Sequence, residues 1–251
     1  MAGGGTLLTF PVMLACGMDA KSANYTNTVG LVPAAFMGAR GFRGAESVGI
    51  GKMFSFYVVS FLGGVVGSIL LIVTSKGQFD AIVPWLILLA AIIFLLHDTI
   101  SRLLFKKAPD AKLSVERDAV AQQAHAPPRK RALAFQFLVA VYGGYFGAGI
   151  GIMMLAALSL MGVGDIYRMN FLKNLAAFVI NGISSIIFAA MGVVYWPIAL
   201  SMAVGAVMGG WLGAGAAKKV GPRWSRRFVS VIGLGMAAYM IYKQFRGPHS
   251  A

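Results

Sequence analysis

The sequence predicts an all-α, polytopic membrane protein, and three observations lead to this prediction. Of the 251 residues, 58% are hydrophobic and only 12% are charged, whereas a soluble domain carries roughly 25% charged residues. The mean hydropathy is +0.76, and apolar runs long enough to cross a bilayer recur along the chain. The 32 glycines suit membrane helices, in which small residues let backbones approach closely. We therefore expect a multi-pass protein of the cell (inner, cytoplasmic-type) membrane, surrounded by lipid bilayer.

The apolar runs give the expected elements in chain order. Three glycines precede a short apolar run at 6–16, and longer spans are expected at 22–40, 48–75 and 79–105. The segment 106–131 has no apolar run and reads as a basic cytoplasmic linker. A long apolar stretch at 132–162 follows, and then spans at 171–191, 194–217 and 225–245. The expected organisation is thus a first transmembrane repeat at 1–105, the linker, and a second transmembrane repeat at 132–251.

The net charge of +14 would indicate nucleic-acid binding in a soluble protein. Here the basic residues lie almost wholly between apolar runs, as in proteins whose cytoplasmic loops are enriched in Lys and Arg. We therefore expect no nucleic-acid partner. The single cysteine, Cys16, allows no internal disulfide.

The two halves of the chain repeat each other. A shift of 146 residues, without gaps, aligns Asp19 with Asp165 and Asn24 with Asn170, and it also aligns several glycines. The acidic match is informative because the chain has only 8 Asp and Glu residues. The second copy has an apolar limb at 132–145 that the first copy lacks, so we expect the natural start to lie upstream of Met1. Internal duplication is common in secondary transporters and also occurs in channels.

The stretch 132–162 can be one kinked span or a re-entrant hairpin of two half-helices. A straight helix of about 30 residues would be roughly 45 Å long, against a hydrocarbon core of about 30 Å. Its centre, GGYFGAGIG at 143–151, disfavours a continuous helix. Simple spans divide the 22 Lys and Arg residues nearly evenly between the two sides, whereas glycine-centred hairpins place all but four on one side. The positive-inside rule favours hairpins, and the two repeats then have inverted orientations.

The broken helices are candidate anion sites, because the amides at an internal helix N-terminus lack partners and carry the positive end of the dipole. In the first copy the candidates are Gly3, Gly4, Gly5 and Thr6, and in the second they are Gly147, Gly149 and Gly151. The alternative is that these glycines only permit close helix packing. The pairs Gly63-Gly64 and Gly209-Gly210 are interpreted as packing seams.

Polar residues that open the following spans offer further contacts to the same region. They are Asn24, Thr26, Asn27 and Thr28 in one copy and Asn170, Lys173 and Asn174 in the other. Hydrogen bonding between helices is the alternative role. Lys173 is either a substrate contact or a side chain that snorkels to the interface. His97 and Asp98 form a candidate proton-coupling pair or an interfacial ion pair.

The glycine clusters, each followed by such a polar stretch, resemble the sulfite exporter TauE/SafE family of membrane permeases. The resemblance covers nearly the whole chain apart from the linker. It implies transport of sulfur oxyanions, sulfonates or other small organic anions, often with protons.

The leading functional hypothesis is therefore a secondary transporter of a small anion that works by alternating access, coupled to protons or to the membrane potential. A passive anion channel and a membrane-embedded enzyme are the alternatives. The chain has no G-x-x-x-x-G-K-[ST] phosphate loop. One Cys and 3 scattered His residues offer no metal-binding pattern, so we expect no cofactor and no metal.

Overall fold

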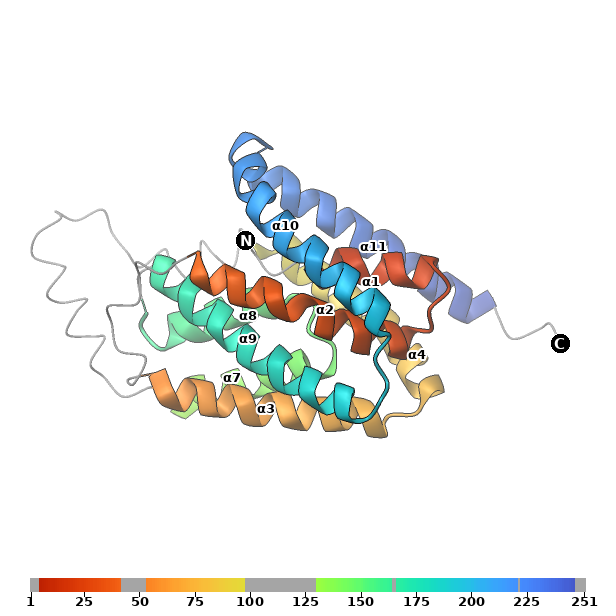
Figure 1. The fold of residues 1–251 in the computed structure, drawn as a ribbon, viewed down its shortest axis with the longest axis horizontal. Helices are drawn as coiled ribbons and strands as arrows, with labels where there is room; N and C mark the ends of the chain where they lie inside the picture. Colours follow the sequence, from red (N-terminus) through yellow and green to blue (C-terminus); the bar gives the residue numbers. More distant parts are fainter. Residues whose placement is uncertain (1–4, 42–52, 98–129, 164–165, 221, 247–251) are drawn as a thin grey trace, which may run out of the picture.

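A computed structural model describes residues 5–41, 53–97, 130–163, 166–220 and 222–246. Within these ranges every regular element is a helix (Figure 1), which confirms the all-α prediction. The helices are α1 (Gly5–Ala15), α2 (Ala20–Arg40), α3 (Phe54–Val73), α4 (Lys76–Leu95), α7 (Lys130–Tyr145), α8 (Ile150–Leu160), α9 (Ile166–Ala190), α10 (Trp196–Val220) and α11 (Pro222–Arg246).

Three of the described helices are long and apolar enough to cross a membrane: Phe54–Val73, Lys76–Leu95 and Tyr167–Ala190. Shorter apolar stretches lie at Gly5–Ala15, Ile150–Leu160, Trp196–Gly209 and Val229–Tyr242. Many large apolar side chains on α3, α4 and α10 are exposed. A surface of this kind suits lipid rather than water.

Capping residues account for two of the helix starts. Asp19 is the N-cap of α2, and its carboxylate accepts a hydrogen bond from the backbone N–H of Ser22 at 3.2 Å. Ser75 and Gln78 form a capping box at the start of α4. Such caps occupy backbone donors that have no partner inside the helix. The chain therefore turns sharply between α1 and α2 and between α3 and α4.

Helices α3, α7 and α9 run in the same direction. Gln136 of α7 donates to Ser60 of α3, and further along both helices Gly67 lies against Tyr145. Helix α9 also runs in the direction of α3, and Gly64 of α3 faces Ile180 of α9. Four residues later on each helix, the hydroxyl of Ser68 donates to that of Ser184.

This shared direction decides between the two interpretations of the stretch 132–162. Since α7 and α9 are parallel and α8 joins them, α8 must run back toward the end where α7 began. Ile150, at the start of α8, contacts Gly143 near the end of α7. The stretch is therefore a helical hairpin and not one continuous kinked span.

The close packing of α3 against α7 depends on small residues. A Cβ on Gly63 would lie 2.5 Å from the Cβ of Ala140, and a Cβ on Gly144 would overlap the carbonyl of Gly64. The backbones of α3 and α7 thus approach closer than any side chain would permit. The prediction of a packing seam is confirmed for Gly63 and Gly64, but it is wrong for Gly209, where a Cβ would have nothing within 4 Å.

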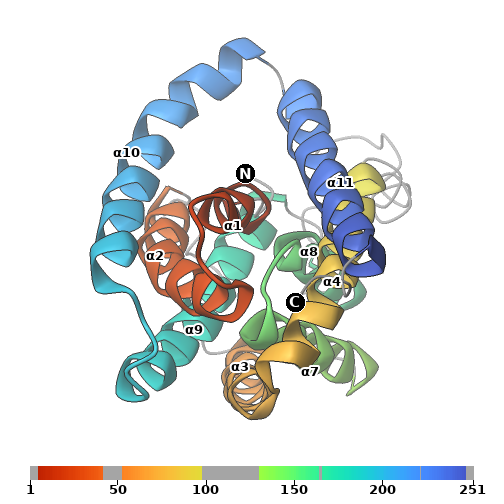
Figure 2. The same ribbon diagram turned by 90° about the vertical axis from the view of Figure 1, so that its right-hand side faces the viewer.

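On the other side of the bundle, α2 is antiparallel to α9, since Phe36 contacts Phe178 and Tyr25 contacts Phe188. Helix α10 runs parallel to α2, since Thr26 bonds to Tyr195 just before α10 and, further along, Gly30 packs against Met202. Figure 2 shows α1 and α8 in the middle of the bundle, with the longer helices around them.

The bundle has two ends, which we call the cavity end and the linker end. The cavity end carries the turns between α1 and α2, α3 and α4, and α9 and α10. Lys21, in the first turn of α2, donates there to the carbonyls of Ile72 and Thr74 at the end of α3. The linker end is the opposite one, where α7 and α9 begin.

Candidate functional site

The break between α7 and α8 is built on two glycines in the left-handed region. Gly147 has φ +79° and Gly149 has φ +77°, and side chains other than glycine rarely adopt this conformation. The hydroxyl of Tyr142 donates to the carbonyl of Ala148 at 2.8 Å, and the N–H of Gly147 donates to the carbonyl of Tyr142. The turn is therefore held by its own side chains as well as by backbone bonds.

Helix α8 starts inside the protein. Ile150 is 5% exposed and Ala148 is fully buried, while Gly149 lies against Ala90 of α4. The first amides of a helix have no acceptor within that helix, and the helix dipole adds positive potential at the same place. The break thus presents backbone donors in a region from which water is largely excluded.

The first described residues of α1 lie at a comparable depth. Gly5 packs against Leu31, near the middle of α2. Around this start the side-chain amide of Asn27 donates to the hydroxyl of Thr6 at 3.3 Å. The hydroxyl of Thr9 donates to the amide oxygen of Asn27. Thr6 and Asn27 are 7% and 1% exposed, so this polar cluster is buried.

The two half-helices approach each other. The rings of Phe10 in α1 and Phe146 in the break lie edge to face, with centroids 5.4 Å apart. Asn24, four residues into α2, donates to the carbonyl of Tyr145 at 2.8 Å. The oxygen of the Asn24 amide is buried and has no hydrogen-bond partner among the described residues. It is an acceptor available to a proton-bearing ligand or to water.

The polar residues near the start of α9 lie elsewhere. Lys173 is 2% exposed, and its ammonium donates to the amide oxygen of Asn170 at 2.9 Å. Asn174 packs against Gly38 near the end of α2. Gly38 is eleven residues beyond Asn27 on α2, or roughly 16 Å along a helix axis. The expectation that both sets meet in one region is therefore not met: one set lies beside the half-helix starts, and the other lies toward the linker end.

The remaining predicted residues are placed as follows. Thr26 is fully buried, and its hydroxyl accepts from the N–H of Tyr195. Gly151 is buried in the first turn of α8. Gly3, Gly4 and Asp98 lie outside the described residues, and His97 lies just beyond α4. No group of three or more potential metal ligands occurs in the part of the chain that the structure describes.

Several polar residues near the breaks were not predicted. Thr9 follows Thr6 by three residues, a spacing that places both on one helix face and could have identified it. Tyr145 contributes its carbonyl to Asn24 and its hydroxyl to Thr74, and no sequence pattern points to that. The bond between Gln136 and Ser60 joins helices far apart in the sequence, so only the fold reveals it.

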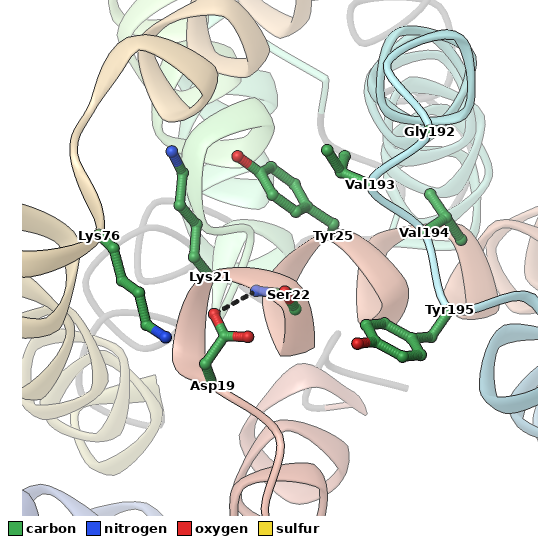
Figure 3. A pocket seen from close by; sticks show the side chains of 9 residues that line it. All are labelled: Asp19, Lys21, Ser22, Tyr25, Lys76, Gly192, Val193, Val194 and Tyr195. Atoms are coloured by element: carbon green, nitrogen blue, oxygen red, sulfur yellow. Dashed lines mark hydrogen bonds between the residues drawn. The ribbon is translucent and has the colours of Figure 1, made fainter.

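A cavity of about 530 Å³ opens at the cavity end (Figure 3). Its wall comes from three segments: the first turns of α2, the start of α4, and the loop before α10. Lys21, Lys76 and Asp19 are its charged residues, and Tyr25 and Tyr195 are its aromatic ones. The ammonium of Lys21 lies 5.9 Å from the centre of the Tyr25 ring. No sequence pattern predicted this cavity.

The fold and the site together define a helical, multi-pass membrane protein with broken helices at its centre. The family model for Sulfite exporter TauE/SafE matches residues 1–240. The chain belongs to this family, which confirms the resemblance seen in the sequence.

Two curated relatives extend over nearly the whole chain. A protein of Haemophilus influenzae named "Probable membrane transporter protein" is 28% identical over 255 residues, covering 97% of this chain and 89% of the relative. A Sinorhizobium protein named "Probable membrane transporter protein ORF9" is 23% identical over 248 residues, covering 96% and 86%. No solved structure matches. Family and relatives alike indicate a membrane transporter and not an enzyme.

Proposed function

We propose that this protein is a secondary transporter of a small anion, such as a sulfur oxyanion, a sulfonate or an organic acid. The observation that carries the proposal is the break between α7 and α8, with the short helix α1 packed beside it. Helix α8 starts inside the bundle beside Gly143 of α7, and Gly5 of α1 lies against Leu31 near the middle of α2. Interrupted helices at mid-depth are typical of the substrate sites of secondary transporters.

The chemistry of the two starts suits an anion. Free amides at a helix N-terminus and the positive end of its dipole favour negative charge. Gly149 and Gly151 leave the backbone of the break without side chains that would block approach. Thr6, Thr9 and Asn27 supply neutral polar groups beside the start of α1. The site would thus bind an oxyanion without needing a net charge at its centre.

We also propose that the two repeats are inverted. The arrangement of the helices supports this: α2 pairs in parallel with α10, α9 pairs in parallel with α3, and α2 and α9 are antiparallel. These are the relations expected if a two-fold axis exchanges α2 with α9 and α3 with α10. Inverted repeats allow one site to open alternately to each side by rocking of one part against the other.

The topology that we propose places the linker end in the cytoplasm. With the helix directions above, all but four of the 22 Lys and Arg residues fall at that end or in the segments that join it. The positive-inside rule assigns such an end to the cytoplasm. The cavity end then faces the outside, and the membrane potential or a proton gradient can drive the anion.

The test is flux into proteoliposomes across a panel of sulfite, sulfate, sulfoacetate, thiosulfate, acetate and chloride, with and without an imposed pH gradient. A carrier gives selective, saturable flux of one member, accelerated by the gradient or by a potential. Non-saturating flux that follows only the electrochemical gradient would identify a passive anion channel. Absence of flux in folded protein that includes any upstream residues would contradict the proposal.

A further inference from the structure

The cavity at the cavity end is lined by charged side chains that have no role in the proposed anion site at the helix breaks. Two ammonium groups, Lys21 and Lys76, and one carboxylate, Asp19, line it. Figure 3 shows Lys21 beside Tyr25, and Lys76 pointing toward Asp19 from the start of α4. The formal charge of the described wall is therefore positive.

The charge of Lys21 is held in place by neutral groups. Its ammonium donates to the carbonyls of Ile72 at 3.0 Å and Thr74 at 2.5 Å, both at the end of α3. These carbonyls orient the ammonium, and an ammonium has three donors, so one remains for a ligand. The ring of Tyr25 lies beneath the same group.

The one carboxylate in the wall is already used. Asp19 caps α2 and accepts from the N–H of Ser22, so its charge is directed at the helix start. It also interacts favourably with the charge of Lys76. Asp80, one turn further along α4, also interacts favourably with the charge of Lys76. The positive charge that the wall leaves for a ligand is therefore mainly that of Lys21, whose ammonium is bonded to carbonyl oxygens.

The cavity is also well placed with respect to the half-helices. Tyr25 in its wall follows Asn24, which bonds the last carbonyl of α7. Tyr195, on the opposite wall, has its backbone N–H bonded to the buried Thr26. The cavity therefore lies directly over the part of α2 that contacts the break between α7 and α8.

We propose that this cavity is the external recognition site for the transported anion, where Lys21 and Lys76 concentrate a small oxyanion before it passes to the half-helices. The proposal rests on the proposed function, because it assumes an anionic substrate and an outward-facing cavity end. A cavity lined by charge of one sign raises the local concentration of the opposite ion. Of the 22 Lys and Arg residues, only four lie at this end in the proposed topology: Lys21, Lys76, Lys243 and Arg246. Two of these four line the cavity.

A first experiment measures the electrostatics of the cavity without any transport. Tyr195 is 57% exposed, so Tyr195→Cys in a Cys16→Ser background places a single thiol in the wall. We expect a negatively charged methanethiosulfonate to react faster than a positively charged one of similar size. Lys76→Gln should reduce that rate ratio about threefold and Lys21→Gln together with Lys76→Gln about tenfold, as expected for loss of charges several ångströms away in partly screened surroundings.

The control is Lys130→Gln, an exposed lysine at the linker end, which should leave the ratio unchanged. Lys76 is exposed, so its variant should fold even if the loss of Lys21 disturbs the end of α3. A rate ratio that does not change in Lys76→Gln would overturn the proposal.

A second experiment uses flux in vesicles of known orientation, and it separates this inference from the proposed function. Lys76→Gln should raise the KM for the anion severalfold when the anion is added on the cavity side and leave kcat nearly unchanged. If flux is robust and KM stays at the wild-type value, the external site is wrong while the transporter assignment stands. If no anion is transported by the wild type, the proposed function fails, and the thiol experiment still reports whether the cavity attracts anions.

Discussion

The side-chain amide of Asn24 donates to the backbone carbonyl of Tyr145 at 2.8 Å, across 121 residues of sequence. This bond joins the first long helix of one half to the last carbonyl of α7 in the other. Because α7 ends at Tyr145, no later N–H of that helix can donate to the Tyr145 carbonyl. Asn24 therefore satisfies a helix end at the point where the central hairpin turns.

Replacing Asn24 by Leu should reduce anion flux at least tenfold, because the hairpin tip loses the group that holds it. The cost to stability should be about 1–3 kcal/mol, since a buried carbonyl is left without a partner. Flux and thermal unfolding in detergent measure the two effects. Thr28→Val is the matched control, because the hydroxyl of Thr28 bonds only to its own helix at Asn24 and should leave flux near the wild-type level. Equal flux in both variants would contradict the role of Asn24.

Gly149→Val should abolish transport, because it forces a β-branched residue into a backbone conformation with φ +77°. The left-handed conformation costs roughly 1–2 kcal/mol for an L-residue. The turn can avoid this cost only by changing its backbone conformation. Gly182→Ala is the control: nothing lies within 4 Å of a Cβ there, and Ala favours the helix by about 1 kcal/mol. Full flux in Gly149→Val, with expression equal to that of Gly182→Ala, would show that the break is not part of the site.

Lys173→Gln should lower flux about tenfold while the protein still folds. Lys173 is 2% exposed and its ammonium donates to Asn170. A buried charge within an apolar span attracts an anion more strongly than an exposed one. Asn170→Leu, which removes an acceptor of the Lys173 ammonium, should have the same effect. Initial flux rates in proteoliposomes measure it, with Lys130→Gln as the exposed control. Unchanged flux in both variants would assign these residues to packing alone.

Asp19→Asn and Asp19→Ala should separate the charge of the cavity wall from helix capping. Asn caps a helix about as well as Asp, whereas Ala costs about 1 kcal/mol. We expect Asp19→Asn to lower the KM for an anion added on the cavity side, because the wall loses its carboxylate, with little change in unfolding temperature. Asp19→Ala should lower the unfolding temperature as well. A higher KM in Asp19→Asn would show that the carboxylate helps to bind the substrate.

Asp19 also gives stability a defined pH dependence. Burial alone would raise the pKa of Asp19, but hydrogen bonds from Ser22 and the positive charge of Lys76 outweigh burial and hold the pKa below its usual value. A carboxyl with a lowered pKa in the folded state stabilises the protein above its unfolded-state pKa of about 3.9. That contribution is lost as the pH falls through the folded-state value. Unfolding temperatures measured from pH 6 to pH 3 should fall more steeply for the wild type than for Asp19→Asn, and parallel curves would contradict this assignment.

The helical class and most element positions could be predicted because they depend on local composition. The expected spans at 22–40 and 171–191 correspond closely to α2 and α9, since a long apolar run with few charges has one stable arrangement in a bilayer. The turn at Gly147 and Gly149 was likewise evident from the glycine cluster. The seam of Gly63 and Gly64 could be predicted for the same reason, as small residues permit close backbones.

The placement of the candidate site could be predicted only in part. Thr6 and Asn27 were expected together and are bonded to each other. Lys173 and Asn174 were expected beside them, but they lie farther toward the linker end. The sequence gives the position of a polar residue along its own helix but not its depth relative to residues on another helix. The antiparallel packing of α2 against α9 sets the relative depth of Asn27 and Lys173.

The sequence by itself determined that this chain is a helical membrane protein of the TauE/SafE family, with glycine-broken elements and a strongly basic side. These properties follow from hydropathy, charge and glycine spacing, which act over short stretches of chain. Only the tertiary structure decided that α7 and α8 form a hairpin, that Asn24 bonds Tyr145, and that Lys21 and Lys76 share a cavity. Each of these depends on contacts between segments far apart in the sequence, and such contacts form only once the helices have packed.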